Sequence, residues 1–270
     1  MTRLSLGAFY NPHLADTILE SAGPIGHLAL ADSPHPSDRR WAQIENRFTL
    51  LAHDYLGQLS EPFTSRQLDR ARALVEQYRS PWAAEHLQRI HPTRQAHRHA
   101  LDVSLDYVFP PLYTEDLLQD YVRNIRILHA HVGVPVAIEP IPTHLQLDFP
   151  QLSEADFLHR LCEESGCFLL LDIPHAMISS CTYGCDPESF ILELPLHRVM
   201  EIHVAGLAFN PDLKRLWIAP IAPDDHILDL AELAAAHAPH LRAITFDAFS
   251  PTLRADTLME GMRLLRERFL

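Results

Sequence analysis

The sequence predicts a single (β/α)8 TIM barrel, an α/β fold in which eight parallel strands alternate with helices. Two observations predict this fold: eight short apolar runs recur along the 270-residue chain, and helical patterns lie between many of them. Most runs show too little alternation for a sheet with one face in water, so they are typical of strands covered on both faces. A doubly wound open sheet is the alternative, but no expected strand is followed by a G-x-G-x-x-G turn, and the chain has only nine glycines.

The apolar runs themselves give the eight expected strands. They are LSLGAF (4–9), IGHLALA (25–31), FTLLAH (48–53), PWAAEHL (81–87), VPVAIEP (134–140), CFLLLDI (167–173), VMEIHVAG (199–206) and LRAITFDAF (241–249). The second and the fourth have the weakest patterns. The length is ordinary for one barrel and no repeat or linker interrupts it, so we expect one domain over residues 1–270.

Capping residues and glycines mark the helices expected between the strands. Helical patterns cover residues 11–23, 64–79, 114–133, 153–166, 226–238 and 251–269. Thr64 and Ser153 stand where N-caps are favoured, and Gly133 and Gly166 stand where helices end. Residues 32–47 are expected to form a loop with a short helical segment, and residues 89–112 are irregular.

The composition excludes some classes of partner. Lys and Arg total 22 against 35 Asp and Glu, for a formal net charge of -13, which argues against binding of nucleic acid or of an anionic membrane. No stretch approaches the ~20 apolar residues of a membrane span, and the first residues lack the apolar core of a signal peptide. We therefore expect a soluble, cytoplasmic protein.

The cysteines do not form a zinc motif. Cys181 and Cys185 are separated by three residues rather than two, and Cys162 and Cys167 do not supply a matching pair. Reduced thiols are expected, with a Cys181–Cys185 disulfide as the open alternative.

Metal-competent side chains end six consecutive expected strands. They are His53, His86 (preceded by Glu85), Glu139, Asp172 (with His175 just beyond it), His203 and Asp247, and the loop after the seventh strand adds Asp224 and His226. Taken alone, Asp172 would be a helix cap. In a barrel, however, these strand ends meet at one mouth. So many carboxylates and imidazoles would repel like charges and shift pKa values steeply unless a cation joined them.

The donor types indicate which metals would fit. Histidine and carboxylate ligands without thiolates suit Fe, Mn or Zn rather than an iron–sulfur cluster. About eight candidate ligands exceed what one ion needs, so two or three metal ions are expected.

The strand ends also resemble a known enzyme family. The segments LAHDYLG, AEHL, VAIEP, LLLDIPHAMISS, EIHVAG, PDDH and ITFDAF are similar to those of the multinuclear non-heme iron-dependent oxidative enzymes, which include the oxidase of methanobactin biosynthesis. The likeness runs from about residue 45 to the end, and GCFLLLDIPHA and EIHVAG are its most specific parts. It implies a TIM barrel with two or three irons in a mixed-valent state. It also implies an oxidase that uses O2 to modify cysteine or another residue of a ribosomally made precursor peptide, which a separate partner protein delivers.

Carried over by motif, this resemblance implies a set of site residues. The implied metal ligands are His53, His86, Glu139, Asp172, His203, Asp224, His226 and Asp247, with His175 as ligand or neighbour and Glu85 as an orienting carboxylate. The chain departs from the family at several positions. His175 stands for the usual Asn, Asp247 for Glu, and Pro140 for the Asn after Glu139, and the acidic-Asn motif near Asp32 is absent. These departures leave the metal count and the substrate open.

Two other functions remain as alternatives. A divalent-metal (Zn or Mn) sugar isomerase, epimerase or endonuclease of the xylose-isomerase type also rings metals with His, Glu and Asp at a barrel mouth. Neither the lysine usual at isomerase sites nor a basic DNA-binding face is evident. The third possibility is a non-catalytic peptide-binding member, although the substituted residues here can still bind metal.

Overall fold

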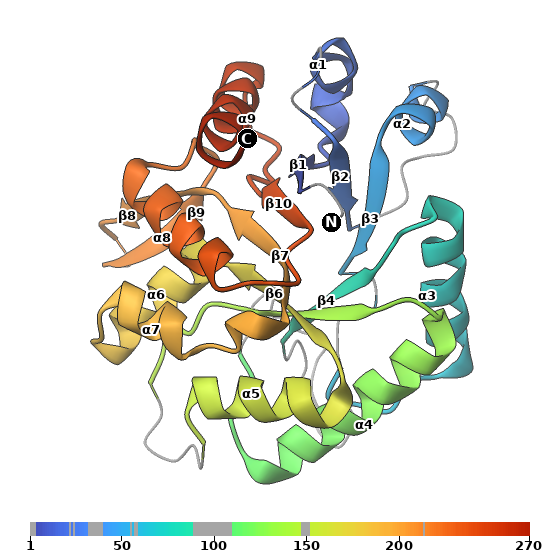
Figure 1. Ribbon diagram of the computed structural model, residues 1–270, viewed down its shortest axis with the longest axis vertical. Coiled ribbons are helices and arrows are strands. Elements are labelled where there is room, and N and C mark those ends of the chain that lie inside the picture. Colours follow the sequence, from blue (N-terminus) through green and yellow to red (C-terminus); the bar gives the residue numbers. More distant parts are fainter. Residues whose placement is uncertain are drawn as a thin grey trace.

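Eight parallel strands close into a barrel, with helices around it (Figure 1). The structure is a computed structural model that describes residues 4–21, 23, 25–31, 40–54, 56, 59–88, 110–146, 152–212 and 214–270. The strands follow one another around the barrel in the order β1-β10-β7-β6-β5-β4-β3-β2. The predicted (β/α)8 TIM barrel is therefore confirmed, and the segment around Asp32 lies outside the described residues.

Each of the eight predicted runs contains one barrel strand, including the two with weak patterns. The strands are β1 (Ser5–Phe9), β2 (His27–Leu30), β3 (Thr49–His53), β4 (Ala83–Leu87), β5 (Val136–Pro140), β6 (Phe168–Asp172), β7 (Val199–Val204) and β10 (Ala243–Phe246). Neighbouring strands pair in parallel, with His86 opposite Glu139 and Asp172 opposite His203. The register alone therefore brings strand-end side chains together.

The helices follow the strands in the alternating order of the fold. They are η1 (Pro12–Leu14), α1 (Ala15–Glu20), α2 (Trp41–Arg47), α3 (Ser65–Tyr78), α4 (Glu115–Val132), α5 (Glu154–Ser165), α6 (Ile173–Tyr183), α7 (Pro187–Glu193), η3 (Leu196–Arg198), α8 (Asp225–Ala236) and α9 (Ala255–Phe269). Thr64 caps α3 in a capping box, and Gly133 and Gly166 end α4 and α5 with positive φ. Among the described residues, no helix has the length and apolarity that crossing a membrane requires.

Helices α6 and α7, the short helix η3 and the hairpin that follows β7 were not expected from the sequence. Helix α6 begins directly at the end of β6 and is largely buried, so it has little apolar periodicity to reveal it. Helix α7 is short. An antiparallel hairpin of β8 (Gly206–Asn210) and β9 (Arg215–Ala219) lies between β7 and α8, at the periphery of the molecule in Figure 1. A Cβ atom on Gly206 would lie 2.2 Å from Cγ1 of Ile221, so glycine is needed where the hairpin begins.

Alternation along the strands separates two apolar layers. The larger core packs the strands against the helices, and a smaller cluster includes Leu51, Ala84, Ala137 and Leu170. Each of these four residues stands two positions before a predicted site residue and therefore lies on the same face of its strand. The strand-end polar groups thus rest on an apolar floor, which fixes their positions and excludes water from beneath them.

Candidate metal centre

Seven of the predicted site residues gather at the carboxyl ends of the barrel strands. This strand-end cluster consists of His53, His86, Glu139, Asp172, His175, His203 and Asp247. Most of its side chains are buried, and those of Glu139 and His203 are 0% exposed. The common mouth of a parallel barrel therefore holds the groups that the sequence predicted there.

Glu139 lies at the centre of the cluster. Its Oε2 atom lies 3.0 Å from Nε2 of His53 and 3.3 Å from Nε2 of His86. Its Oε1 atom lies 3.3 Å from Nδ1 of His175, and His203 approaches Oε2 at 3.9 Å through Nδ1. One carboxylate therefore contacts four imidazoles from β3, β4, β7 and the start of α6.

Two strand-end histidines have a second carboxylate behind them. Nδ1 of His86 lies 3.1 Å from Oδ1 of Asp54, so Nε2 is the nitrogen that faces Glu139. Nε2 of His203 lies 3.1 Å from Oε1 of Glu201, so Nδ1 faces Glu139 and Asp247. Such outer carboxylates orient the rings of metal-binding histidines in many proteins.

Asp172 has two roles in this geometry. Its Oδ1 atom accepts a hydrogen bond from the backbone N–H of His175 at 2.6 Å and so caps α6. Asp172 also belongs to a group of four residues, with Glu139, His203 and Asp247, whose ligand atoms lie within 4.8 Å of one another. The cap explains how its carboxylate is held, and it does not remove the residue from the cluster.

His175 is used as a donor in this structure. Its Nδ1 atom lies 3.0 Å from the carbonyl oxygen of Pro140, which has no proton to give, so Nδ1–H donates to that oxygen. The same nitrogen lies 3.3 Å from Glu139 and 3.8 Å from Asp172. Without a metal, the carbonyl of Pro140 therefore holds the ring of His175 beside the carboxylate of Glu139.

Protons on two histidines offset part of the negative charge of the cluster. Burial opposes charge on His86, but Glu139 and Asp54 outweigh it and raise the pKa of His86 well above its usual value. Burial likewise opposes charge on His203, but Asp247, Glu139 and Glu201 raise its pKa well above the usual range. Burial would raise the pKa of Glu139, yet the charges of His86 and His203 lower it. The two imidazolium protons therefore occupy the role that a cation would take.

The remaining pKa shifts follow from desolvation. Burial raises the pKa of Asp172 to about 6, and burial lowers that of His53. Asp172 is thus a buried carboxylate with a raised pKa beside imidazoles with raised pKa values. In such an environment a bound cation would replace several protons.

Unused lone pairs provide a direct test of whether a metal fits. Within the described part of the chain, neither carboxylate oxygen of Glu139 has a partner in hydrogen-bond geometry, and Nδ1 of His53 has none. Buried polar atoms are otherwise almost always satisfied. Two overlapping groups, His53–Glu139–His203 and Glu139–Asp172–His203–Asp247, bring ligand atoms within 4.8 Å of one another. The nitrogen and oxygen donors present therefore fit a divalent metal, with Glu139 and His203 common to both groups.

Three predicted residues lie elsewhere. Asp224 is exposed and caps α8, where its Oδ1 atom accepts from the backbone N–H of Ile227 at 3.0 Å. His226 is exposed in the first turn of α8. Glu85 is buried, and its Oε1 atom accepts from the backbone N–H of Leu56 at 3.1 Å, so it holds the loop after β3. None of the three belongs to the two groups of ligand atoms found among the described residues.

Two carboxylates of the site were missed by sequence reasoning. Asp54 follows His53 directly and contacts His86, and Glu201 stands two positions before His203 on β7. Strand alternation could have indicated Glu201, because residues i and i+2 share a face. The four cysteines are free, so the alternative Cys181–Cys185 disulfide is absent from this structure.

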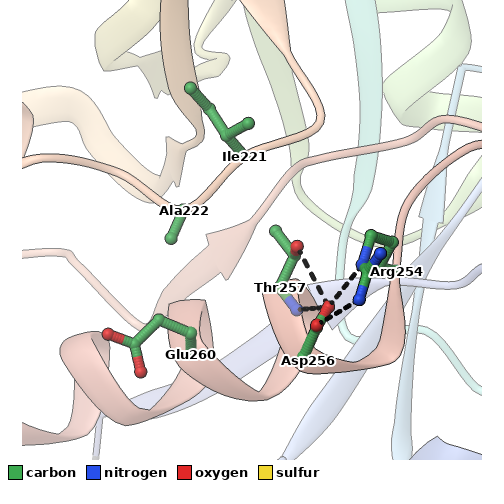
Figure 2. A pocket seen from close by; sticks show the side chains of 6 residues that line it. All are labelled: Ile221, Ala222, Arg254, Asp256, Thr257 and Glu260. Atoms are coloured by element: carbon green, nitrogen blue, oxygen red, sulfur yellow. Dashed lines mark hydrogen bonds and ion pairs between the residues drawn. The ribbon is translucent and has the colours of Figure 1, made fainter.

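An open hollow of about 420 Å³ is lined by none of the cluster residues (Figure 2). Its lining residues are Ile221, Ala222, Arg254, Asp256, Thr257 and Glu260. Arg254 pairs with Asp256 at 2.7 Å, and Asp256 accepts from the backbone N–H of Thr257 at 2.9 Å. The hollow is thus a surface feature at the start of α9, where Arg254 pairs with Asp256 and Glu260 pairs with Arg263. The reactive groups lie in the buried cluster instead.

A family model described as "RiPP precursor modification enzyme MbnB/TglH/ChrH" matches residues 29–237 of this chain. Among curated relatives, a "UPF0276 protein" of Bordetella pertussis is 26% identical over 243 residues, which cover 85% of this chain and 81% of the relative. A "UPF0276 protein" of Alcanivorax borkumensis is 28% identical over 174 residues, which cover 62% of this chain and 55% of that protein.

Solved structures share the fold at low identity. D-psicose 3-epimerase from Clostridium cellulolyticum H10 superposes with a TM-score of 0.61 at 12% identity and covers 98% of both chains. A xylose isomerase-like TIM barrel protein from Mycobacterium smegmatis, in complex with magnesium, superposes with a TM-score of 0.60 at 11% identity over 99% of this chain and 98% of that one. At this identity the likeness concerns the fold alone.

Proposed function

This chain belongs to the MbnB/TglH/ChrH family of RiPP precursor modification enzymes, and we propose from this that it is an iron-dependent, O2-using oxidase that modifies a residue of a ribosomally synthesised precursor peptide. The modified residue is cysteine or another side chain of that peptide. The proposal includes a separate partner protein that delivers the peptide, as the resemblance of the strand-end segments implies.

The observation that carries the proposal is the buried carboxylate of Glu139. Its oxygens contact His53, His86 and His175 but form no hydrogen bonds with described residues. Two overlapping groups of ligand atoms share Glu139 and His203, which suits at least two adjacent cations. Nitrogen and carboxylate donors suit iron, manganese or zinc, and of these zinc has no redox chemistry.

The residues of this chain would hold the metals, orient the imidazoles and keep water away from them. His53, His86, Glu139, Asp172, His203 and Asp247 would hold the ions, and bound iron would supply the electron transfer with O2 that oxidises the peptide. Asp54 and Glu201 would keep two of the imidazoles in one orientation. These groups rest on the apolar floor of the barrel, which keeps water from reaching them from below.

A row of aromatic rings in edge-to-face and tilted contact connects the cluster with the surface. The ring of Phe9 lies 5.5 Å from that of His53 and 5.2 Å from that of Phe249, as measured between ring centroids. Phe249 is 61% exposed, whereas Phe9 and His53 are buried. We propose that a peptide side chain enters along this row of rings, where they would shield the oxidised atom from water.

A sugar isomerase or epimerase is the competing function. The solved epimerases share the barrel, but a fold hosts many activities and does not by itself assign one. The only lysine of the sequence, Lys214, is exposed in the hairpin turn, so the lysine usual at isomerase sites has no candidate in the cluster. We therefore favour the oxidase.

Metal analysis and O2 consumption test the proposal together. The protein would be purified without oxygen, loaded with Fe(II), and mixed with the peptide encoded beside its gene. We expect two or three irons per chain and O2 uptake only when the peptide is present, with both lost in Glu139→Gln. One zinc or manganese per chain and no O2 uptake with the peptide would overturn the proposal.

A further inference from the structure

Glu201 breaks the apolar floor beneath the strand-end cluster. On β3, β4, β5 and β6, the residue two positions before the cluster residue is apolar: Leu51, Ala84, Ala137 and Leu170. On β7 that place belongs to Glu201, which is 1% exposed. A buried carboxylate costs several kcal/mol unless donors surround it. The contacts of Glu201 must therefore explain why a carboxylate is buried in the apolar floor.

Three donors satisfy Glu201. The indole Nε1–H of Trp82 donates to Oε2 at 2.8 Å, and the hydroxyl of Thr245 donates to Oε1 at 2.6 Å. The third donor is Nε2–H of His203, which lies 3.1 Å from Oε1. A carboxylate accepts and an indole N–H only donates, so the direction of these bonds is fixed. Donors from β7, from β10 and from the residue just before β4 therefore fix the position of Glu201.

The direction of the bonds can be followed beyond Thr245. Because its proton goes to Glu201, the oxygen of Thr245 accepts from Nε2–H of His27, 2.9 Å away. Nδ1 of His27 then has no proton and accepts from the hydroxyl of Ser5 at 2.8 Å. A chain of three residues thus runs across the barrel interior, and each of its hydrogen bonds points toward Glu201.

Glycine makes this chain possible. Gly7 on β1 is in register with both His27 on β2 and Thr245 on β10. A Cβ atom on Gly7 would lie 2.4 Å from Nε2 of His27, where a side chain cannot fit. The missing side chain therefore lets His27 reach Thr245 over the strand that separates them.

We propose that Glu201 is a positioning residue of the metal centre, which keeps the proton of His203 on Nε2 and so leaves Nδ1 as the nitrogen that binds metal. Nδ1 of His203 already faces Asp247 at 3.2 Å and Glu139 at 3.9 Å. Trp82 and the chain of Ser5, His27 and Thr245 hold Glu201 in turn. The inference rests on the metal centre of the proposed function but does not depend on which peptide is oxidised.

Titration with a metal alone tests this role. Co(II) would be added without oxygen to metal-free protein, and its affinity and visible spectrum would be measured for the wild type, Glu201→Gln and Thr245→Val. We expect Glu201→Gln to weaken Co(II) binding roughly 10- to 100-fold and to change the ligand-field bands, because an amide also donates and no longer enforces one tautomer. Thr245→Val keeps the carboxylate but removes one donor. It should therefore change the Co(II) affinity and the ligand-field bands in the same direction as Glu201→Gln, but by less.

A second buried carboxylate provides the matched control. Glu154 is 6% exposed and accepts from Tyr183 at 2.9 Å, but it does not contact His203. Glu154→Gln should leave the affinity and spectrum of Co(II) unchanged. A folded Glu201→Gln protein with wild-type affinity and spectrum would overturn the inference. If Glu201→Gln does not fold, Thr245→Val and Trp82→Phe test the inference in its place. Wild-type Co(II) spectra in both variants would overturn the inference.

The outcomes separate this inference from the proposed function. A wild type that binds Co(II) and responds to Glu201→Gln, but oxidises no peptide, would overturn the proposed oxidase and support the positioning role. A wild type that binds neither Co(II) nor Fe(II) would overturn both. An active oxidase in which Glu201→Gln changes neither metal affinity nor spectrum would overturn the positioning role alone.

Discussion

Nδ1 of His86 lies 3.1 Å from Oδ1 of Asp54, and the backbone of Asp54 is held at a φ of 48°. That conformation is the left-handed region, which only glycine enters freely and which Asn and Asp tolerate better than other residues. Gln88 also donates to Oδ1 of Asp54, at 3.3 Å. An unfavourable backbone conformation directly beside a cluster residue indicates that the carboxylate is placed for His86.

Asp54→Asn separates the charge from the backbone conformation. Asn tolerates the left-handed region, so we expect little change in thermal unfolding, but the neutral amide no longer favours one orientation of His86. We expect Fe(II) affinity to fall about tenfold, measured without oxygen by competition with a chelator. Asp54→Ala should lose the same affinity and, in addition, about 1 kcal/mol of stability from the left-handed strain. Wild-type affinity in Asp54→Asn would contradict the orienting role.

His175→Asn distinguishes a ligand from a donor. Nδ1–H of His175 donates to the carbonyl oxygen of Pro140, and Nδ1 lies 3.3 Å from Glu139, so the ring is held beside Glu139 while its proton points to Pro140. We expect His175→Asn to keep its full metal content by elemental analysis and to bind those ions a few-fold more weakly, as expected for an outer partner. Glu139→Gln is the comparison, and it should lose nearly all the metal. A loss of one ion per chain in His175→Asn would make His175 a ligand.

The α8 cap provides a third comparison. Asp224 accepts from the backbone N–H of Ile227, so Asp224→Ala should cost about 1 kcal/mol in urea unfolding through loss of the N-cap. His226→Ala should cost little, since its side chain is exposed. In both variants we expect the ions held by the strand-end cluster to remain. Loss of one ion per chain from both variants would instead identify Asp224 and His226 as ligands of a further ion.

Strand ends were predictable, and contacts across the barrel were not. The positions of His53, Glu139 and His203 follow from where apolar runs end, because parallel strands bring their carboxyl ends to one mouth. The partners of Glu201 are different, since Trp82 is 119 residues away in the chain and Thr245 is 44. Only the barrel order places them together.

Local backbone conformation could not be predicted from the sequence either. The sequence contains Asp54 beside His53, but nothing in the residue types fixes a φ of 48°, which turns the carboxylate toward His86. The hairpin of β8 and β9 was also missed, because its first residue ended a strand run and its exposed apolar residues do not belong to the core.

The pH dependence of metal binding follows from the protons in the cluster. Glu139 and other carboxylates raise the pKa of His86 and of His203, so both imidazoles hold a proton at neutral pH in the metal-free protein. Metal must displace these protons, so affinity should rise with pH, by up to ~10-fold per pH unit for each proton released. Calorimetric titration with Co(II) in two buffers of different ionisation enthalpy would count the protons.

Two comparisons make the pH result decisive. With His86 replaced by Gln, one proton fewer should be released, so the slope of affinity against pH should become shallower. An affinity of the wild type that does not change between pH 6 and pH 8 would contradict the raised imidazole pKa values.

Glu154 lies outside the strand-end cluster, beside His175 and Asp172, and gives a pH-dependent stability of its own. Burial raises the pKa of Glu154 from 4.5 to about 7, although Tyr183 and Thr143 donate to its Oε2 atom at 2.9 Å and 3.4 Å. Between pH 4.5 and about pH 7, the folded protein therefore holds a proton on Glu154 that the unfolded chain has released. The corresponding stability is fully present below about pH 4.5 and is lost as the pH rises through about 7.

Glu154→Gln removes this dependence, because the amide stays neutral at every pH and its oxygen can still accept from Tyr183. We expect the variant to be more stable than the wild type by roughly 2 kcal/mol at pH 8, with the difference approaching zero near pH 5. Urea unfolding of both metal-free proteins at several pH values measures this difference. Tyr183→Phe, which removes a donor to the charged carboxylate, should lower stability more at pH 8 than at pH 5. Equal differences between Glu154→Gln and wild type at the two pH values would show that Glu154 does not carry its proton in the folded protein.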